Sequence, residues 1–359
     1  MDIGISLTPN RNRGADPHDA VRHLVWAARY ADEHNFDYVW STEHHFTDVA
    51  FSSSPSVILS HYAAVTERAK LGYAVAIVPF HHPVRLAEDM AWVDNFSNGR
   101  LVGGASPGWA AYEFSVFGVP LEERRERFLE AFEIVRKALA GGKFSHEGQF
   151  WTVPETQIMP PPVQKGGPKF VSATTSKDGL EMTARLRISP LLGFESPEGL
   201  AEQRQHYIDV ARQEGVGQEE LDDLLTRFGA LRRVIIRDTD EEALEEAIEA
   251  AGGFQAGSAK LKIDARTNLP VEGIVRRRGD ADAGKDPRES YAYKGTLWGS
   301  PDSVVQKLLE LRDAGLGHVV LQFHSPTRDP ESVKDNIRRF ATEVLPAYQS
   351  EVRPPAGVY

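Results

Sequence analysis

Hydrophobic positions along the chain alternate between two patterns. Short runs rich in β-branched and aromatic residues, such as FDYVWS at 36–41, are typical of buried strands. Each run is followed by a longer stretch with apolar residues on one helical face. Several of these stretches begin with a capping residue and a proline, as at Asp16 and Pro17. This alternation is typical of parallel strands joined by crossover helices.

Eight pairs of a strand and a helix are predicted. The strands cover residues 3–7, 36–41, 70–79, 100–105, 168–173, 188–192, 230–238 and 318–323. The helices that follow them cover 17–34, 54–68, 83–96, 121–140, a segment from 177, 198–214, 240–251 and 330–345, and one more, 300–315, precedes the last strand. Eight such units favour a single α/β domain over residues 1–359, a (β/α)8 TIM barrel with its active site at the carboxyl ends of the strands.

A long insertion separates the seventh and eighth strands. Residues 252–298 include RRRGDADAGKDPRE and show little periodicity. A connection of this length in a compact domain is typical of a lid or a binding loop. A solvated charged loop without such a role is the alternative.

Composition and charge narrow the classes of partner. The chain has 359 residues, of which 41% are hydrophobic and 26% charged, as in an ordinary globular protein. Its net charge of −11 argues against nucleic acid or an anionic membrane surface as the main partner. The absence of cysteine excludes thiol nucleophiles and disulfides. No signal-peptide pattern and no apolar run of membrane-spanning length is present, so a cytoplasmic location is expected.

The clearest candidate for chemistry is STEHHF at 41–46, directly after the second strand. Glu43, His44 and His45 place a carboxylate and two imidazoles at the predicted barrel mouth. A histidine titrates near neutral pH, which suits a general acid or base, although a rim histidine held for structural reasons is the alternative. Adjacent side chains of an extended backbone point to opposite faces, so His44 and His45 are not expected to share one small cavity.

Metal binding is disfavoured, since the chain has neither His-x-His in the first strand nor HExxH on a helix. Other strand ends offer candidates for a bound organic cofactor. The third strand carries the small residue Ala74, and a glycine-rich loop and a hydroxyl-rich turn follow the fourth and fifth strands. The residues of that loop and that turn are Ser106, Gly108 and Trp109, and Ala173, Thr174, Thr175 and Ser176. The turn precedes a helix, so it suits either a phosphate or simple helix capping.

The order of these motifs resembles the bacterial luciferase family of flavin-dependent monooxygenases. The resemblance rests on FDYVWSTEHHF, on LGYAVAIVPFHHPVRLAEDMAWVDNFSNGR, and on the D-x-x-S-x-G-R spacing from Asp94 to Arg100. It implies a barrel that binds reduced FMN (FMNH2), which reacts with O2 to a C4a-(hydro)peroxyflavin that oxygenates a small organic substrate. It also implies a separate flavin reductase as the source of reduced FMN, and a homodimer.

The resemblance assigns roles to particular residues. His44 matches the catalytic histidine of the family, with Glu43 and His45 as supporting residues. A non-proline cis peptide beneath the flavin ring is expected at Ala74–Val75. Luciferase has a cysteine and an arginine where this chain has Ser106 and Pro107, so the phosphate ligands must differ. Thr174, Thr175 and Ser176 are the remaining candidates, and the insertion corresponds to the mobile loop of the family.

Two other activities remain open at this point. One is a deazaflavin-dependent hydride-transfer enzyme, because that group shares the barrel and the histidine. The other is a flavin-binding subunit without catalysis, like the accessory chain of a luciferase heterodimer. The complete EHH motif favours the monooxygenase over both.

Overall fold

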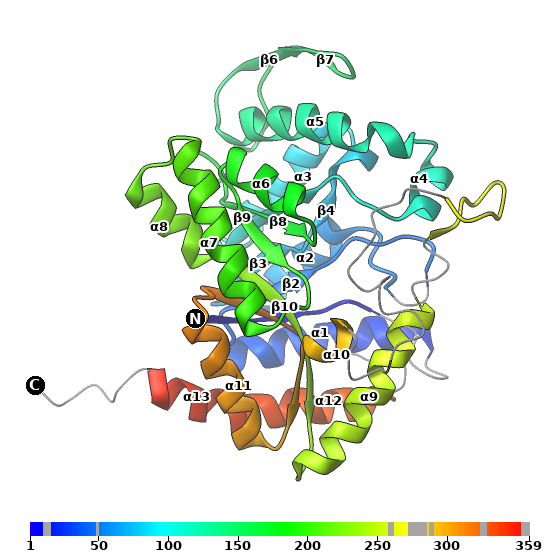
Figure 1. Cartoon of the computed structure of the whole chain (residues 1–359). Coiled ribbons are helices and arrows are strands. Elements are labelled where there is room, and N and C mark those ends of the chain that lie inside the picture. The colour runs from blue at the N-terminus through cyan, green and yellow to red at the C-terminus, as the bar shows by residue number, and fades with distance from the viewer. Residues whose placement is uncertain are drawn as a thin grey trace, which may run out of the picture.

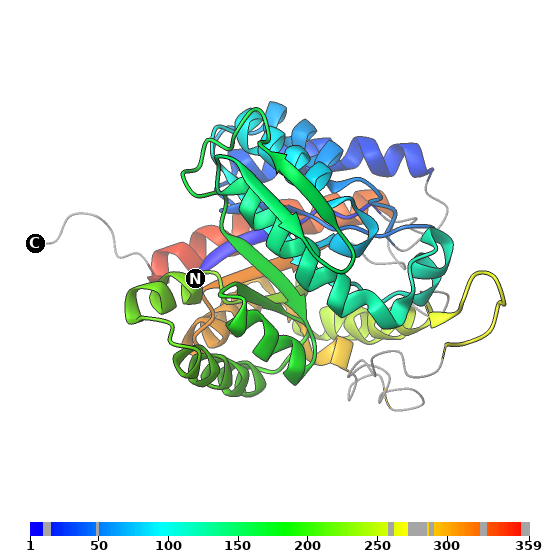
Figure 2. The same cartoon turned by 90° about the horizontal axis from the view of Figure 1, so that it is seen from above.

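Eight parallel strands form a closed barrel at the centre of the molecule, with helices around it (Figures 1 and 2). The structure is a computed structural model that describes residues 1–9, 16–47, 50–257, 262–271, 286, 291–323 and 329–352. The barrel strands are β1 (Asp2–Ser6), β2 (Tyr38–Ser41), β3 (Lys70–Tyr73), β5 (Leu101–Ser106), β8 (Phe170–Thr174), β9 (Ser189–Leu192), β10 (Gly229–Ile236) and β12 (His318–Gln322). Each pairs in parallel with the next, and β12 pairs with β1, which closes the ring. The predicted (β/α)8 fold is confirmed.

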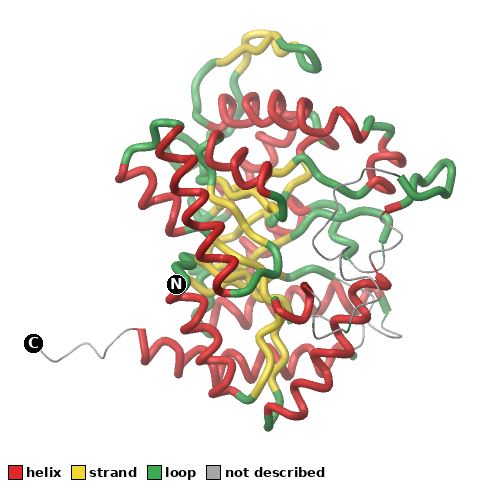
Figure 3. The backbone as a smooth tube through the Cα atoms, in the orientation of Figure 1, coloured by secondary structure: helices red, strands yellow, loops and turns green. Residues whose placement is uncertain are grey.

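The main helices cover the outside of the barrel, as predicted (Figure 3). They are α1 (Pro17–Glu33), α2 (Pro55–Val65), α3 (Pro83–Phe96), α5 (Arg124–Leu139), α6 (Lys177–Arg185), α7 (Pro197–Gln213), α9 (Asp240–Gly257), α11 (Pro301–Asp313) and α12 (Pro330–Arg339). Local capping fixes where they begin. Asp16 accepts a hydrogen bond from the His18 amide at α1, and Ser196 accepts one from the Gly199 amide at α7. No helix within the described ranges has the length and apolar character of a membrane span.

Several shorter elements lie outside the predicted set. They are α4 (Ala111–Phe117), β6 (Phe144–Glu147), β7 (Thr152–Thr156), α8 (Gln218–Thr226), α10 (Tyr291–Lys294), β11 (Thr296–Gly299) and α13 (Leu345–Val352). The predicted third strand, 70–79, is divided into β3, which ends at Tyr73, and β4 (Ala76–Ile77). β6 and β7 form an antiparallel hairpin outside the ring of helices, at the top of Figure 1. β11 adds to the outer half of β10 in parallel, so the end of the predicted insertion is a strand.

Two apolar layers hold the barrel. The larger lies between strands and helices, and a smaller one fills the barrel interior with Tyr38, Trp40 and other inward side chains. Trp40 needs the glycine of the neighbouring strand, because a Cβ at Gly72 would lie 2.1 Å from the Trp40 ring. On its other side the Trp40 Nε1 donates a hydrogen bond of 3.0 Å to Nε2 of His318. His318 is therefore a neutral hydrogen-bond acceptor in the barrel interior.

His318 gives the fold an expected sensitivity to acid. Burial, together with the charge of Lys70, lowers the pKa of His318 to about 3. The unfolded chain binds this proton below pH ~6.5, whereas the folded chain does not, so stability is lost as the pH falls from about 6.5 towards 3. The His318→Gln variant keeps an acceptor for Trp40 and removes the titration. We expect its free energy of unfolding to fall less steeply than that of the parent, by about 1.4 kcal/mol per pH unit. Urea unfolding from pH 4 to 7 measures this, and parallel pH curves would exclude it.

Candidate functional site

The carboxyl ends of the strands form a mouth that solvent reaches from outside. Inward side chains deep in the barrel, such as Val171 and Val320, are buried. Nearer the mouth, the inward residues of three strands keep some exposure: Ala74 after β3, Ala173 on β8 and Gln322 on β12. Ala173 is exposed although every other residue of β8 is buried. Short side chains at Ala74 and Ala173 leave room there for a flat ligand.

Glu43 is a buried carboxylate with three hydrogen-bond donors. Its side chain accepts from Nε2 of His45 at 3.0 Å, from Nε2 of His81 at 2.8 Å and from the Ile77 amide at 2.7 Å. Burial alone raises the pKa of Glu43, but these donors outweigh it and hold the pKa below its usual range. Burial lowers the pKa of His81, and the Glu43 carboxylate reverses this and raises it. Glu43 thus ties the end of β2 to β4 and to the start of α3.

His44 has a different partner from its neighbour. Nδ1 of His44 lies 3.0 Å from Oε1 of Glu113 on α4, and the same oxygen accepts from the His45 amide at 2.9 Å. The Glu113 side chain is fully buried, whereas that of His44 is 24% exposed. The Trp109 ring stands edge-on to His44 at 6.4 Å. The prediction that the two histidines point to different surroundings is confirmed, since His45 is buried among Phe46, Phe80 and Phe117.

Glu113 was missed by the sequence reasoning. Its carboxylate orients His44 and leaves the second ring nitrogen, Nε2, as the atom that can give or take a proton at the mouth. The second carboxylate oxygen, Oε2, is buried and has no hydrogen-bond partner among the described residues. A carboxylate followed by apolar residues in EFSVFG, after the fourth strand, is the one signal in the sequence that could have indicated it.

The peptide bond between Ala74 and Val75 is cis, as predicted. It lies in the gap between β3 and β4, so the backbone leaves the regular ladder at the mouth. The neighbouring strand β5 approaches closely here. A Cβ at Gly104 would lie 1.8 Å from the Tyr73 carbonyl oxygen, so only glycine fits at this position.

The end of β5 and the loop after it bring Ser106, Gly108 and Trp109 to the same side as His44. Residues 104–108 also read as Gly-x-Ser-x-Gly, the spacing of a hydrolase nucleophile elbow. The Ser106 hydroxyl instead accepts a hydrogen bond from the Gly108 amide at 3.2 Å, and it makes none to a histidine of the described chain. Gly108 has a φ of +74°, which suits glycine at this tight turn. The geometry therefore does not support a serine nucleophile.

The turn after β8 combines hydroxyl groups with a helix N-terminus. Thr174 Oγ1 lies 3.4 Å from the Ser176 amide, and the Ser176 hydroxyl accepts from the Gly179 amide at 3.1 Å, which caps α6. Thr175 lies between them and is partly exposed. Arg125 of α5 reaches the same helix end, with its guanidinium 3.8 Å from Asp178. Arg125 was also missed from the sequence, and it supplies a cation where Pro107 cannot.

Within the predicted lid, 252–298, residues 258–261, 272–285 and 287–290 lie outside the described residues. One described part, 262–271, contacts α4, where the Ala265 amide donates to the Ser115 hydroxyl at 2.8 Å. Ser115 is two residues from Glu113, so this part of the insertion lies close to the candidate site.

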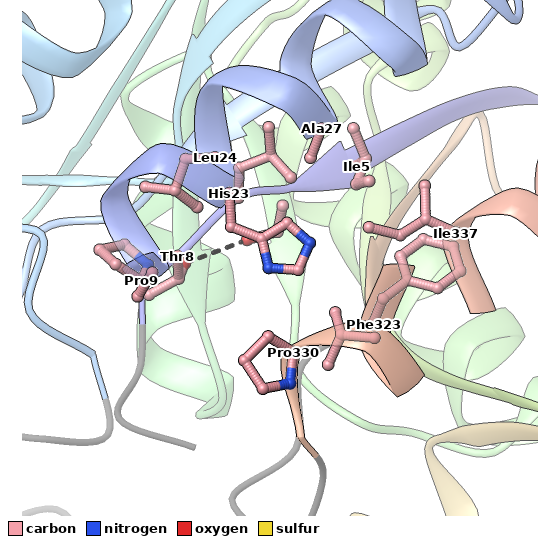
Figure 4. Close-up of a pocket in the computed structure, with 13 residues that line it drawn as sticks. Ile5, Thr8, Pro9, His23, Leu24, Ala27, Phe323, Pro330 and Ile337 are labelled. Atoms are coloured by element: carbon pink, nitrogen blue, oxygen red, sulfur yellow. Dashed lines mark hydrogen bonds between the residues drawn. The ribbon is translucent and has the colours of Figure 1, made fainter. Parts of the chain in front are cut away.

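One open pocket lies outside the barrel wall, between β1, α1 and α12 (Figure 4). Figure 4 shows His23 of α1 among mostly apolar neighbours, including Leu24, Phe323 and Ile337. Burial, and then the charge of Lys334, lower the pKa of His23 to about 4, so it is neutral near pH 7. Among the described residues that line this pocket, His23 is the one with an ionisable side chain. We therefore assign the candidate site to the barrel mouth.

Among the residues that the structure describes, no group of three or more metal-binding side chains is placed to hold an ion. The mouth instead combines a carboxylate-paired histidine, a cis peptide and a hydroxyl-rich helix end. This arrangement suits proton transfer beside a flat, phosphate-bearing ligand.

A model of the luciferase-like monooxygenases matches residues 1–318. The chain belongs to the luciferase-like monooxygenase family. Limonene 1,2-monooxygenase of Rhodococcus erythropolis is 27% identical over 60% of this chain and 56% of its own length. The oxygenase component of flavin-dependent trigonelline monooxygenase from Acinetobacter baylyi is 25% identical over 90% of this chain and 89% of its own. The alignment with a Sinorhizobium fredii protein of unassigned function, 33% identical, spans 44% of each chain.

Two solved structures share the fold of this chain. Monooxygenase RslO1 of Streptomyces bottropensis superposes with a TM-score of 0.80 at 25% identity, over 97% of this chain and all of its own. An F420-dependent secondary alcohol dehydrogenase superposes with a TM-score of 0.72 at 16% identity, over 97% of this chain and 98% of its own. The second likeness shows the barrel alone, so the family assignment does not by itself choose between FMN and a deazaflavin.

Proposed function

We propose that this chain is a monooxygenase that uses reduced FMN and O2 to oxygenate a small organic substrate. The observation that carries the proposal is the partly exposed His44, held by the buried Glu113 at a mouth with short inner side chains. Bound reduced FMN supplies the electrons that activate O2. The flavin-dependent trigonelline relative, aligned over 90% of this chain, supports this choice of cofactor.

The residues of the mouth fit such a cofactor. Ala74, Val75 and Ala173 offer a flat wall for the ring system, and Ser106, Gly108 and Trp109 border it on the side of β5. Thr174, Thr175, Ser176 and Arg125 would hold the phosphate, because hydroxyls, helix amides and a guanidinium all donate to phosphate oxygens. His44 would transfer a proton at Nε2 while Glu113 fixes its ring. Glu43 and His45 would keep this end of β2 rigid.

Two partners belong to the proposal. A separate reductase would supply the reduced FMN, and the name of the trigonelline relative, an oxygenase component, supports such a division. A second copy of the chain would form a homodimer, which agrees with the exposed aromatic pair Trp92 and Phe96 on α3.

The insertion, 252–298, would act as a lid that keeps water from the reacting groups.

The cofactor is tested by anaerobic titration of the protein with reduced FMN and, in parallel, with reduced deazaflavin F420. We expect reduced FMN to bind and to quench tryptophan fluorescence, with F420 weaker by at least about tenfold. Tighter binding of F420 would replace the proposal with hydride transfer. If the protein binds neither compound, both the FMN-dependent and the F420-dependent activity are excluded.

The Arg125→Gln variant is expected to lose its preference for FMN over riboflavin. The two flavins differ only by the phosphate, and a hydrogen bond to a charged group corresponds to about 10- to 100-fold in affinity. Competition binding with both flavins measures this ratio. Lys137→Gln removes a positive charge from the exposed side of the same helix and serves as the control. If Arg125→Gln and the parent chain show the same ratio of FMN affinity to riboflavin affinity, Arg125 does not bind the phosphate.

A further inference from the structure

Two adjacent arginines on β10, Arg232 and Arg233, are both buried, with 1% and 4% of their surfaces exposed. The role of Arg232 is visible in its contacts. Its guanidinium donates to the carbonyl oxygens of Leu231, Gly193 and Glu195, so it fastens the loop after β9 to β10. The functions assigned above leave Arg233 without a role.

Strand register places Arg233 on the inner side of the barrel. Leu231 packs against the cluster that fills the barrel interior, and it pairs in register with Val320 of that cluster. Side chains two positions apart on a strand share a face, so Arg233 points the same way, one layer nearer the mouth. Its register partners are Gln322 of β12 and Thr296 of β11. The Arg233 guanidinium lies 5.1 Å from the centre of the Phe194 ring.

The position of β10 in the barrel shows which strand the Arg233 side chain faces. In the closed order of eight strands, β10 is four steps from β3 in either direction, so the two strands face each other across the barrel. The cis peptide and Ala74 follow β3. A flat cofactor against that wall would leave the substrate on the side of the barrel from which Arg233 projects. An eight-stranded barrel is narrow enough for one side chain to reach a ligand at its centre.

The chemistry of Arg233 then selects the kind of substrate. The Arg233 guanidinium carries a positive charge, and its planar fork matches the two oxygens of a carboxylate. The buried carboxylates Glu43 and Glu113 lie on the opposite side, at the ends of β2 and on α4. An anionic group is attracted to Arg233 and repelled from them, which would leave the rest of the molecule facing His44. Neutral inner residues, Ala173 and Leu231, line the space between.

We propose that Arg233 binds a carboxylate of the substrate, and that this enzyme acts on an apolar or aromatic carboxylic acid. The inference deepens the proposed function, because it names the substrate class of the same mouth. Gln322, the inner neighbour of Arg233, offers a second donor to the same carboxylate.

Matched probes test the proposal without knowledge of the natural substrate. Benzoate and nicotinate are compared with benzamide and nicotinamide, which have nearly the same shape and no charge. Binding to the whole chain, with and without FMN, is measured by calorimetry. We expect at least one acid to bind about 10- to 100-fold more tightly than its amide, and Arg233→Gln to abolish the difference. Arg233→Lys, which keeps the charge but not the fork, is expected to retain part of it.

The control is Arg237→Gln, which removes an equal charge four residues further on, where the side chain pairs with Glu246 of α9. It is expected to keep the preference for the acids. Acids and amides that bind alike in the parent chain, or a preference that survives in Arg233→Gln, would overturn the proposal. If the chain prefers the acids but does not bind FMN, the proposed role of Arg233 stands and the proposed FMN-dependent function is excluded.

Discussion

Replacing His44 with glutamine is expected to lower product formation about 100-fold or more, with reduced FMN bound as well as by the parent chain. Glutamine can keep a hydrogen bond to Glu113 but cannot transfer a proton at Nε2. The measurement is the rate of product formation at saturating reduced FMN. The substrate is taken from a panel of limonene, trigonelline and alkanals, the compounds that appear in the names of the relatives.

Two companion variants separate proton transfer from support. His45→Gln removes the ring that donates to Glu43, and we expect it to lower stability more than turnover. Glu113→Gln keeps the shape of the side chain but not its charge, and we expect a loss in turnover of about tenfold with little change in flavin affinity. Unchanged turnover in His44→Gln would contradict the catalytic role of His44.

Replacing Glu43 with glutamine is expected to lower the free energy of unfolding by about 3 to 5 kcal/mol. The carboxylate is fully buried, and its three donors from His45, His81 and Ile77 would each lose a charged acceptor. Urea unfolding of Glu43→Gln and the parent chain measures the loss. Glu33→Gln, an exposed site on α1, is the control and should change stability by less than about 0.5 kcal/mol.

The loss should depend on pH in a defined direction. The pKa of Glu43 is lowered in the folded chain, so its stabilisation is present above about pH 4.3 and is lost as the pH falls through the folded value. The pKa of His81 is raised, so its stabilisation is present below about pH 6.5 and is lost as the pH rises through the folded value. The difference in free energy of unfolding between the parent chain and Glu43→Gln should therefore be largest from about pH 4.5 to 6.5. A difference that is constant from pH 4 to 9 would contradict this pairing.

Regular alternation of strands and helices made the barrel predictable from the sequence. Capping signals such as Asp16 with Pro17 mark helix starts through contacts within a few residues, and those contacts do not depend on the rest of the fold. Short elements without a repeated pattern were missed for the opposite reason. β11 has four residues and is stabilised by pairing with β10, more than fifty residues earlier in the chain. α4 spans seven residues, too few for a helical period to stand out.

The candidate site was predictable where one motif carries its own chemistry. STEHHF marked Glu43, His44 and His45 because three ionisable groups stand together after a strand. Glu113 lies 69 residues from His44 along the chain, so only the closed barrel brings them together. The same holds for Arg125 of α5, which reaches the start of α6, and for Arg233, whose direction depends on strand register. Partners joined by tertiary contacts leave no local pattern in the sequence.

The central claim is that this chain holds reduced FMN while it reacts with O2. The most direct test mixes the anaerobic complex of protein and reduced FMN with oxygenated buffer in a stopped-flow instrument, and records oxygen consumption and the return of oxidised flavin separately. The account predicts that oxygen is consumed faster than oxidised flavin returns, and that the delay is shortened in His44→Gln. Simultaneous oxygen loss and flavin oxidation, at the rate of free FMN, would contradict it.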